Sequence, residues 1–326
     1  MNPRHHWIEK TQVQLATLAA LAFMYLVVWP LVAPWDPKGA AAFIPYAGIG
    51  KLALLGGCVW LLAIVIGLLT TTARPDGAMM AVVLGIGGIS LHSPQMRSLL
   101  WQRQSLSELY GQLTVETILL AVIVIVAMLL VGLVRMAVGR VAPSCLWRAP
   151  SDVVGPDRLT GVRLMLQATL GLGSQPTPTG ANKPRAGASA VGSARVLAKS
   201  LLCLGLSALV AVVLLLVLLK SSDRGQVIFA VFGAFFLAML VGHQVFPSPC
   251  GVAAWIVPIL IACAFYSLTG AIGLDSEPDA WTKIPFYGRV LPVDWVSAGI
   301  GGALLGFWIS ARMHEAKIIE SRKQQE

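Results

Sequence analysis

Apolar residues gather along the chain in long runs that short polar stretches separate. The runs cover residues 13–33, 47–70, 78–93, 115–134, 201–219, 227–246, 252–273 and 295–311. An α-helix rises 1.5 Å per residue, so about 20 apolar residues cross roughly 30 Å of hydrocarbon. Most of the runs have that length. The pattern therefore predicts an all-α, polytopic bundle of about eight transmembrane helices.

The third run, residues 78–93, is the shortest and is rich in glycine, with Gly85, Gly87 and Gly88 close together. Small residues let two helix backbones approach closely, so we expect this run to pack against a neighbouring helix and not against lipid. Whether it crosses the membrane decides the topology, because without it the number of crossings is odd. The stretch that follows, residues 94–113, mixes apolar and charged side chains and favours a helix lying in the membrane interface.

A polar, basic interval over residues 135–200 divides the chain into two halves, residues 1–134 and 201–326, with about four spans each. Within it, residues 157–170 place leucines and a valine at helical spacing beside arginines, which predicts an amphipathic helix. Residues 171–194 are mainly Gly, Ser, Thr, Pro and Ala, which predicts a flexible linker that a protease cuts.

The basic residues are unevenly distributed between the loops. Sixteen of the 24 Lys and Arg residues lie in the N-terminal tail, the turn at Arg74, the central interval and the C-terminal tail. With eight spans these regions share one side, and the positive-inside rule assigns them to the cytoplasm. We therefore expect a multi-pass protein of the cell membrane with both termini cytoplasmic. This topology accounts for the net charge of +9 without a nucleic-acid partner.

Composition supports the membrane assignment, since 56% of the residues are hydrophobic and only 12% are charged. Soluble domains carry about a quarter charged residues, so the lipid bilayer is the expected surrounding. The five cysteines form no CxxC pair, and the sequence predicts no disulfide framework, no metal site and no cofactor. The first run is long and lacks a clean cleavage site, so we expect a retained helix.

The two halves share a short sequence pattern. Tyr110-Gly111 precedes the fourth span and Tyr287-Gly288 precedes the eighth, each followed by an aliphatic residue and then a valine and a carboxylate. This suggests a duplicated four-span unit with its symmetry axis along the membrane normal. The alternative is that interfacial turns favour these residues independently.

Glu116 and Asp294 occupy matching positions at the predicted extracytoplasmic entry of the fourth and eighth spans. Ionisable groups next to hydrocarbon are costly and usually functional, so the pair is a candidate site for a cation or a proton. The alternative is that each carboxylate only complements the positive end of its helix.

Four further residues lie at a similar depth and are candidates for an extracytoplasmic pocket; they are His92, Tyr110, Tyr287 and Arg289. Interfacial anchoring of Tyr and Arg is the competing explanation. His243, near the predicted cytoplasmic end of the sixth span, is a candidate proton-relay residue, or it hydrogen-bonds to carbonyls freed by Pro247.

The chain contains no GxSxG, HExxH, Walker or CxxCH motif, so no enzyme class receives positive support. The first functional hypothesis is a non-enzymatic scaffold or accessory subunit that binds other membrane proteins. The alternative is a small-molecule or ion transporter with a site between the halves. A weaker alternative is a membrane enzyme that acts on a lipid-linked substrate.

Overall fold

The computed structural model describes residues 3–34, 39–73, 75–93, 96, 99–100, 105–142, 188–247, 251–272 and 280–323. All the regular structure within these residues is helical. Seven of the helices are long and apolar enough to cross a membrane, and an eighth, shorter apolar helix covers residues 77–92. The predicted all-α multi-pass bundle is confirmed.

The first half begins with a helix that runs through three labelled parts, α1 (Pro3–Phe23), the π-helical turn η1 (Met24–Val28) and α2 (Trp29–Val32). A second π-helical turn, η2 (Phe43–Ala47), precedes the next membrane helix. The remaining helices are α3 (Ile49–Leu69), α4 (Pro75–His92) and α6 (Leu106–Val141).

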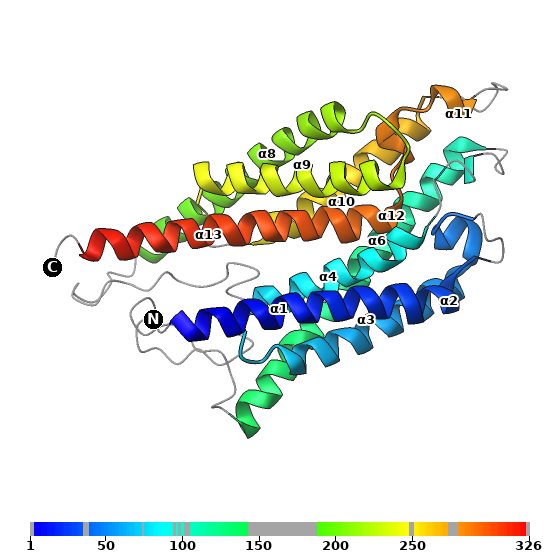
Figure 1. The fold of residues 1–326 in the computed structure, drawn as a ribbon. Helices are drawn as coiled ribbons and strands as arrows, with labels where there is room; N and C mark the ends of the chain where they lie inside the picture. Colours follow the sequence, from blue (N-terminus) through cyan, green and yellow to red (C-terminus); the bar gives the residue numbers. More distant parts are fainter. Residues whose placement is uncertain are drawn as a thin grey trace.

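The second half contains the long helices α8 (Ala188–Leu218), α9 (Arg224–Val245), α10 (Val252–Gly270) and α13 (Ile300–Lys323). Short elements lead into α13; they are α11 (Ala280–Lys283), the 3-10 turn η5 (Phe286–Arg289), α12 (Pro292–Asp294) and the π-helical turn η6 (Trp295–Gly299). The start of α1 and the end of α13 lie at the same end of the bundle (Figure 1). We call the opposite end, near α2 and α12, the distal end.

Two predicted boundaries were wrong. Residues 106–113 are the first turns of the continuous helix α6 and do not form a separate interface helix. Ser105 caps this helix by accepting the Glu108 N–H at 3.3 Å, which explains why it starts there. Residues 188–194 belong to α8 and not to a linker. The predicted amphipathic helix at 157–170 and the linker over 171–187 lie outside the described residues.

Glycines allow the closest helix approaches in both halves. A Cβ atom added at Gly88 of α4 would lie 2.6 Å from the Leu21 carbonyl oxygen of α1, and one at Gly85 would lie 2.7 Å from the Ala20 Cβ. In the second half, an added Cβ at Gly302 of α13 would overlap the Phe232 carbonyl oxygen of α9. The expectation that the glycine-rich run packs on a protein neighbour is therefore confirmed.

The two halves share one helix pairing, α3 on α6 in the first and α9 on α13 in the second, and differ in another. In the first half α1 packs mainly on α4 and α3 on α6, whereas in the second half α8 and α13 both pack on α9. Between the halves, α6 packs on α10, and α4 packs on η6 and α13. The contacts between the halves are those that the suggested duplication would give. In that duplication α4 corresponds to α10 and α6 to α13, so the contact of α6 with α10 is equivalent to the contact of α13 with α4. The duplication stays a prediction.

Candidate functional site

Asp294 lies fully buried near the distal end, where side chains from two helices and one backbone N–H meet its carboxylate. Arg224 of α9 donates from Nη1 to Oδ2 at 2.7 Å and from Nη2 to Oδ1 at 2.6 Å. The Leu291 N–H donates to Oδ2 at 3.0 Å, and the Ser90 hydroxyl of α4 donates to Oδ1. Both carboxylate oxygens are therefore saturated with donors.

The arginine completes this arrangement with two further bonds to α4. Its Nη2 donates to the Ser90 carbonyl oxygen at 2.8 Å and to the Ser90 hydroxyl at 3.0 Å. The pair thus joins α4 of the first half to α9 and α12 of the second. We call Arg224, Asp294 and Ser90 the distal clamp. A two-pronged guanidinium–carboxylate contact fixes geometry as well as charge, so the clamp holds the two halves in one register.

The alternative explanation for Asp294, that it complements a helix start, is also correct in part. Its carboxylate accepts the Leu291 N–H three residues earlier, which satisfies one of the unpaired donors at the beginning of a helix. Sequence analysis did not single out Arg224. The sequence does contain a signal for it. Arg224 is an arginine at the start of the sixth span, on the expected extracytoplasmic side, where the positive-inside rule predicts few arginines.

Glu116 is equally buried but has far fewer partners. Its Oε2 accepts the Ile44 N–H at 2.9 Å, whereas Oε1 has no hydrogen-bond partner. The Phe43 amide also faces the carboxyl group without completing a bond to Oε1. Because α6 begins at Leu106, Glu116 lies well inside the helix, and its interpretation as an acid in the first turn was wrong.

Two tyrosines hold the segment that leads into α12. Tyr110 of α6 donates its hydroxyl to the Gly288 carbonyl oxygen at 2.8 Å, and Tyr266 of α10 donates to the Val290 carbonyl oxygen at 2.5 Å. Their ring centroids are 5.9 Å apart. Tyr266 also lies within electrostatic range of both Asp294 and Glu116. Both predicted carboxyl groups therefore act electrostatically on the same tyrosine of α10, while each bonds to a different segment.

Tyr287 and Arg289 belong to the same segment before α12, in η5. The Tyr287 ring packs against Phe265 with centroids 4.5 Å apart. Arg289 donates to the Ile284 carbonyl oxygen, at 3.1 Å from Nε and 2.8 Å from Nη2, and its guanidinium lies 4.8 Å from the centre of the Phe286 ring. Burial lowers the pKa of this guanidinium from its usual value. These bonds shape the segment locally.

The two histidine candidates lie at opposite ends of the bundle. His92 stacks between Tyr25 and Trp29 near the distal end, with ring centroids 4.1 and 5.1 Å away. The His243 Nδ1 lies 2.7 Å from the Ser310 hydroxyl, which ties α9 to α13. Each histidine therefore packs within its own helix pair. In the described part of the chain, no group of three His, Cys, Asp or Glu side chains is placed to hold a metal ion.

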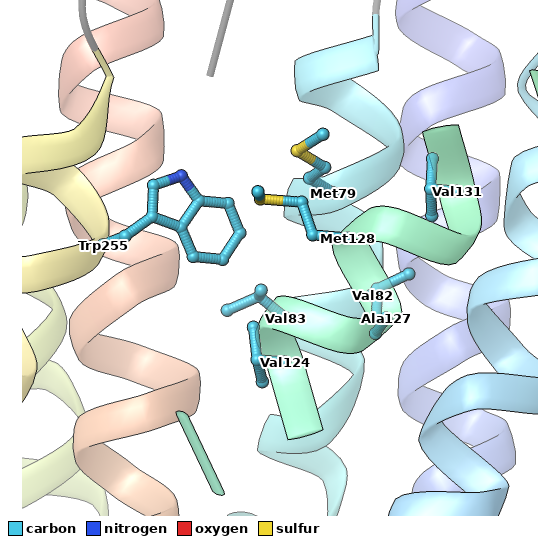
Figure 2. A pocket seen from close by; sticks show the side chains of 8 residues that line it. All are labelled: Met79, Val82, Val83, Val124, Ala127, Met128, Val131 and Trp255. Atoms are coloured by element: carbon cyan, nitrogen blue, oxygen red, sulfur yellow. The ribbon is translucent and has the colours of Figure 1, made fainter. Parts of the chain in front are cut away.

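A small cavity lies between the halves, away from both carboxylates. Its lining is Met79, Val82, Val83, Val124, Ala127, Met128, Val131 and Trp255. The Trp255 ring of α10 faces the sulfur-bearing side chains of Met79 and Met128 across it (Figure 2). Nothing in this lining is charged.

The comparisons with known proteins add no assignment to this geometry. The chain matches no protein-family model, no curated protein and no solved structure. What the described residues establish is an integral, multi-pass helical membrane protein with a buried ionic clamp between its halves.

Proposed function

We propose that the protein is a non-enzymatic scaffold or accessory subunit of a membrane assembly. The observation that supports this best is the distal clamp. The Asp294 carboxylate is saturated by bonds to Arg224, to Ser90 and to a helix start. Both Nη atoms of the arginine are committed to Asp294 and Ser90, and its buried Nε is the one polar atom of the clamp without a partner among the described residues. A site that exchanged a ligand would need some of these donors and acceptors to be available.

The packing of the halves supports the same proposal. The cavity between them is small, apolar and distant from the carboxylates, so it offers no polar path to either one. Glycine contacts such as Gly88 on the α1 backbone and Gly302 on the α9 backbone leave little room for helices to slide. A rigid body of this kind suits a component that holds partners in place.

A disulfide that joins the two halves distinguishes the scaffold proposal from the transporter alternative, because a transporter has to alternate between two conformations. A Cβ atom at Gly87 of α4 would lie 3.9 Å from the Ser297 Cβ of η6, within the range of about 3.5–4.5 Å that a disulfide needs. The variant G87C/S297C, made with the five native cysteines replaced, therefore locks the halves when oxidised. A protease site inserted between Gly173 and Arg195 verifies the lock, because the fragments stay joined until reduced.

The readout is the native-gel profile of membrane complexes in cells that lack the chain. We expect at least one complex to be lost or reduced, and both the oxidised and the reduced G87C/S297C protein to restore it. Single-cysteine variants are the matched controls. Restoration by the reduced form alone would show that the halves must move, and would favour the transporter alternative. An unchanged profile in the deleted cells would overturn the scaffold proposal.

A further inference from the structure

Irregular backbone enters the bundle at the distal end between α2 and α3. Residues 39–42 are buried although they form no regular helix, and η2 and Gly48, with φ of +87°, follow them. We call residues 39–48 the distal segment. Backbone N–H groups in a membrane protein need partners inside the protein, because hydrocarbon supplies none. The structure therefore has to satisfy this segment with side chains from neighbouring helices.

Two side chains provide such partners. The hydroxyl of Ser93, the residue after α4, accepts the Ala41 N–H at 2.7 Å, and Glu116 accepts the Ile44 N–H at 2.9 Å. These bonds hold the segment against α4 and α6. Of the two, only Glu116 can change its charge.

The surroundings of Glu116 suit a neutral carboxyl group. No described Lys, Arg or His side chain forms an ion pair with it, and Oε1 has no hydrogen-bond partner. Tyr266 of α10 lies within electrostatic range of Glu116, of Tyr110 on the same helix as Glu116, and of Asp294 with its partner Arg224. The other elements packed on α6 near this end contribute Tyr46 of η2 and Lys51 of α3, and Lys51 donates to the Ala33 carbonyl oxygen. Arg224 is already paired with Asp294. An ionised group in such a site, with one N–H bond from Ile44 and the neutral Phe43 amide beside it, is much costlier to bury than its protonated form.

We propose that Glu116 is a proton-binding site in which the bound proton keeps the distal segment closed. The carboxylic acid keeps its Oε2 acceptor for Ile44 and carries the proton on Oε1. When the proton leaves to bulk water, the carboxylate requires water or a cation, and the segment opens to admit it. In the open, hydrated state Glu116 would release its proton at ordinary acidic pH. At neutral pH the closed state therefore binds one proton more than the open state, and rising pH favours opening.

Infrared spectroscopy of the full-length protein in lipid bilayers tests the proton directly. We expect a protonated-carboxyl stretch above the amide I band at neutral pH, its loss at alkaline pH, and its absence in Glu116→Gln at every pH. Glu108→Gln is the matched control, because Glu108 is an exposed glutamate on the same helix. An identical band in wild type and Glu116→Gln would show that Glu116 is ionised, and the proposal would fail.

Cysteine labelling tests the coupling to the distal segment. Ala42→Cys is placed in a protein without native cysteines and labelled with a membrane-impermeant maleimide, with Ile49→Cys as the exposed reference. While the closed state keeps its proton, the labelling rate relative to the reference should rise with pH by up to about tenfold per pH unit, the limit for release of one proton, and it should level off once the closed state has also lost the proton. The same cysteine beside Glu116→Gln should show only the pH response of the thiol. Equal profiles in the two backgrounds would overturn the coupling. Neither experiment depends on the proposed scaffold role.

Discussion

Two buried carboxyl groups near the distal end illustrate opposite ways of keeping an acid inside a membrane protein. Asp294 receives a two-pronged arginine, a serine hydroxyl and a backbone N–H, whereas Glu116 receives a single backbone N–H. Both are fully buried, and both lie within electrostatic range of Tyr266. The difference indicates that Asp294 is an ionised structural element and that Glu116 is suited to hold a proton. Matching sequence positions thus carry different chemistry.

The largest expected effect comes from removing the charge partner of Asp294. Arg224→Met leaves a buried carboxylate unpaired, which should reduce the free energy of unfolding by about 3–5 kcal/mol. The measurement is denaturant unfolding in detergent micelles followed by tryptophan fluorescence. The double variant R224M/D294L should recover most of the loss, because an apolar pair of similar volume is often neutral. Wild-type stability of Arg224→Met alone would contradict the clamp.

Two serines at the end of α4, Ser90 within the helix and Ser93 just after it, compare the two regions directly. Ser93→Ala leaves the buried Ala41 N–H without its acceptor, at an expected cost of about 1–3 kcal/mol in unfolding free energy. Ser90→Ala removes only one of several donors to Asp294, and should cost about 0.5–1.5 kcal/mol. The same unfolding assay compares them. The reverse order would mean that the serine, and not the arginine, dominates the clamp.

Tyr110 of the first half and Tyr266 of the second half both bond to the segment before α12. Replacement of either by Phe removes one hydroxyl donor and should lower the unfolding free energy by about 0.5–1.5 kcal/mol. Because the rings are neighbours, the double variant should depart from the sum of the single effects. A double-mutant cycle measures that coupling. Tyr25→Phe, at an exposed tyrosine stacked on His92, provides a control for loss of a hydroxyl elsewhere.

The smallest effect is expected at Glu116. Gln has the same shape and can still accept the Ile44 N–H, so Glu116→Gln should change the unfolding free energy by less than about 0.5 kcal/mol at neutral pH. Asp294→Asn, the equivalent change in the clamp, should be far more damaging because it removes the negative charge from Arg224. A similar loss in both variants would show that Glu116 is ionised and paired.

Much of the fold could be predicted because a helix in lipid must be long, apolar and internally hydrogen-bonded. The runs at residues 47–70 and 227–246 agree with α3 and α9 within a few residues. The segment at 94–113 was harder, because polar residues at the end of a membrane helix resemble those of an interfacial helix. Its final part proved to be the start of α6, held by the Ser105 cap.

The candidate site was predicted less completely. Glu116 and Asp294 stood out because carboxylates are rare beside apolar runs, and Tyr110 was found through its repeated Tyr-Gly pattern. Arg224 and Ser90 were missed, since their importance comes from contacts with residues 70 and 204 positions away in the chain. Tyr266 lies within an apolar helix and carried no sequence signal of its bond to Val290.

The sequence by itself determined that this chain is a multi-pass helical membrane protein, because hydropathy and helix length act locally along the chain. It also determined which carboxylates are exceptional. Only the tertiary structure decided that an arginine reaches Asp294 and none pairs with Glu116 among the described residues. The reason is that the cost of burying a charge depends on which donors other helices place around it, and no local pattern contains that information.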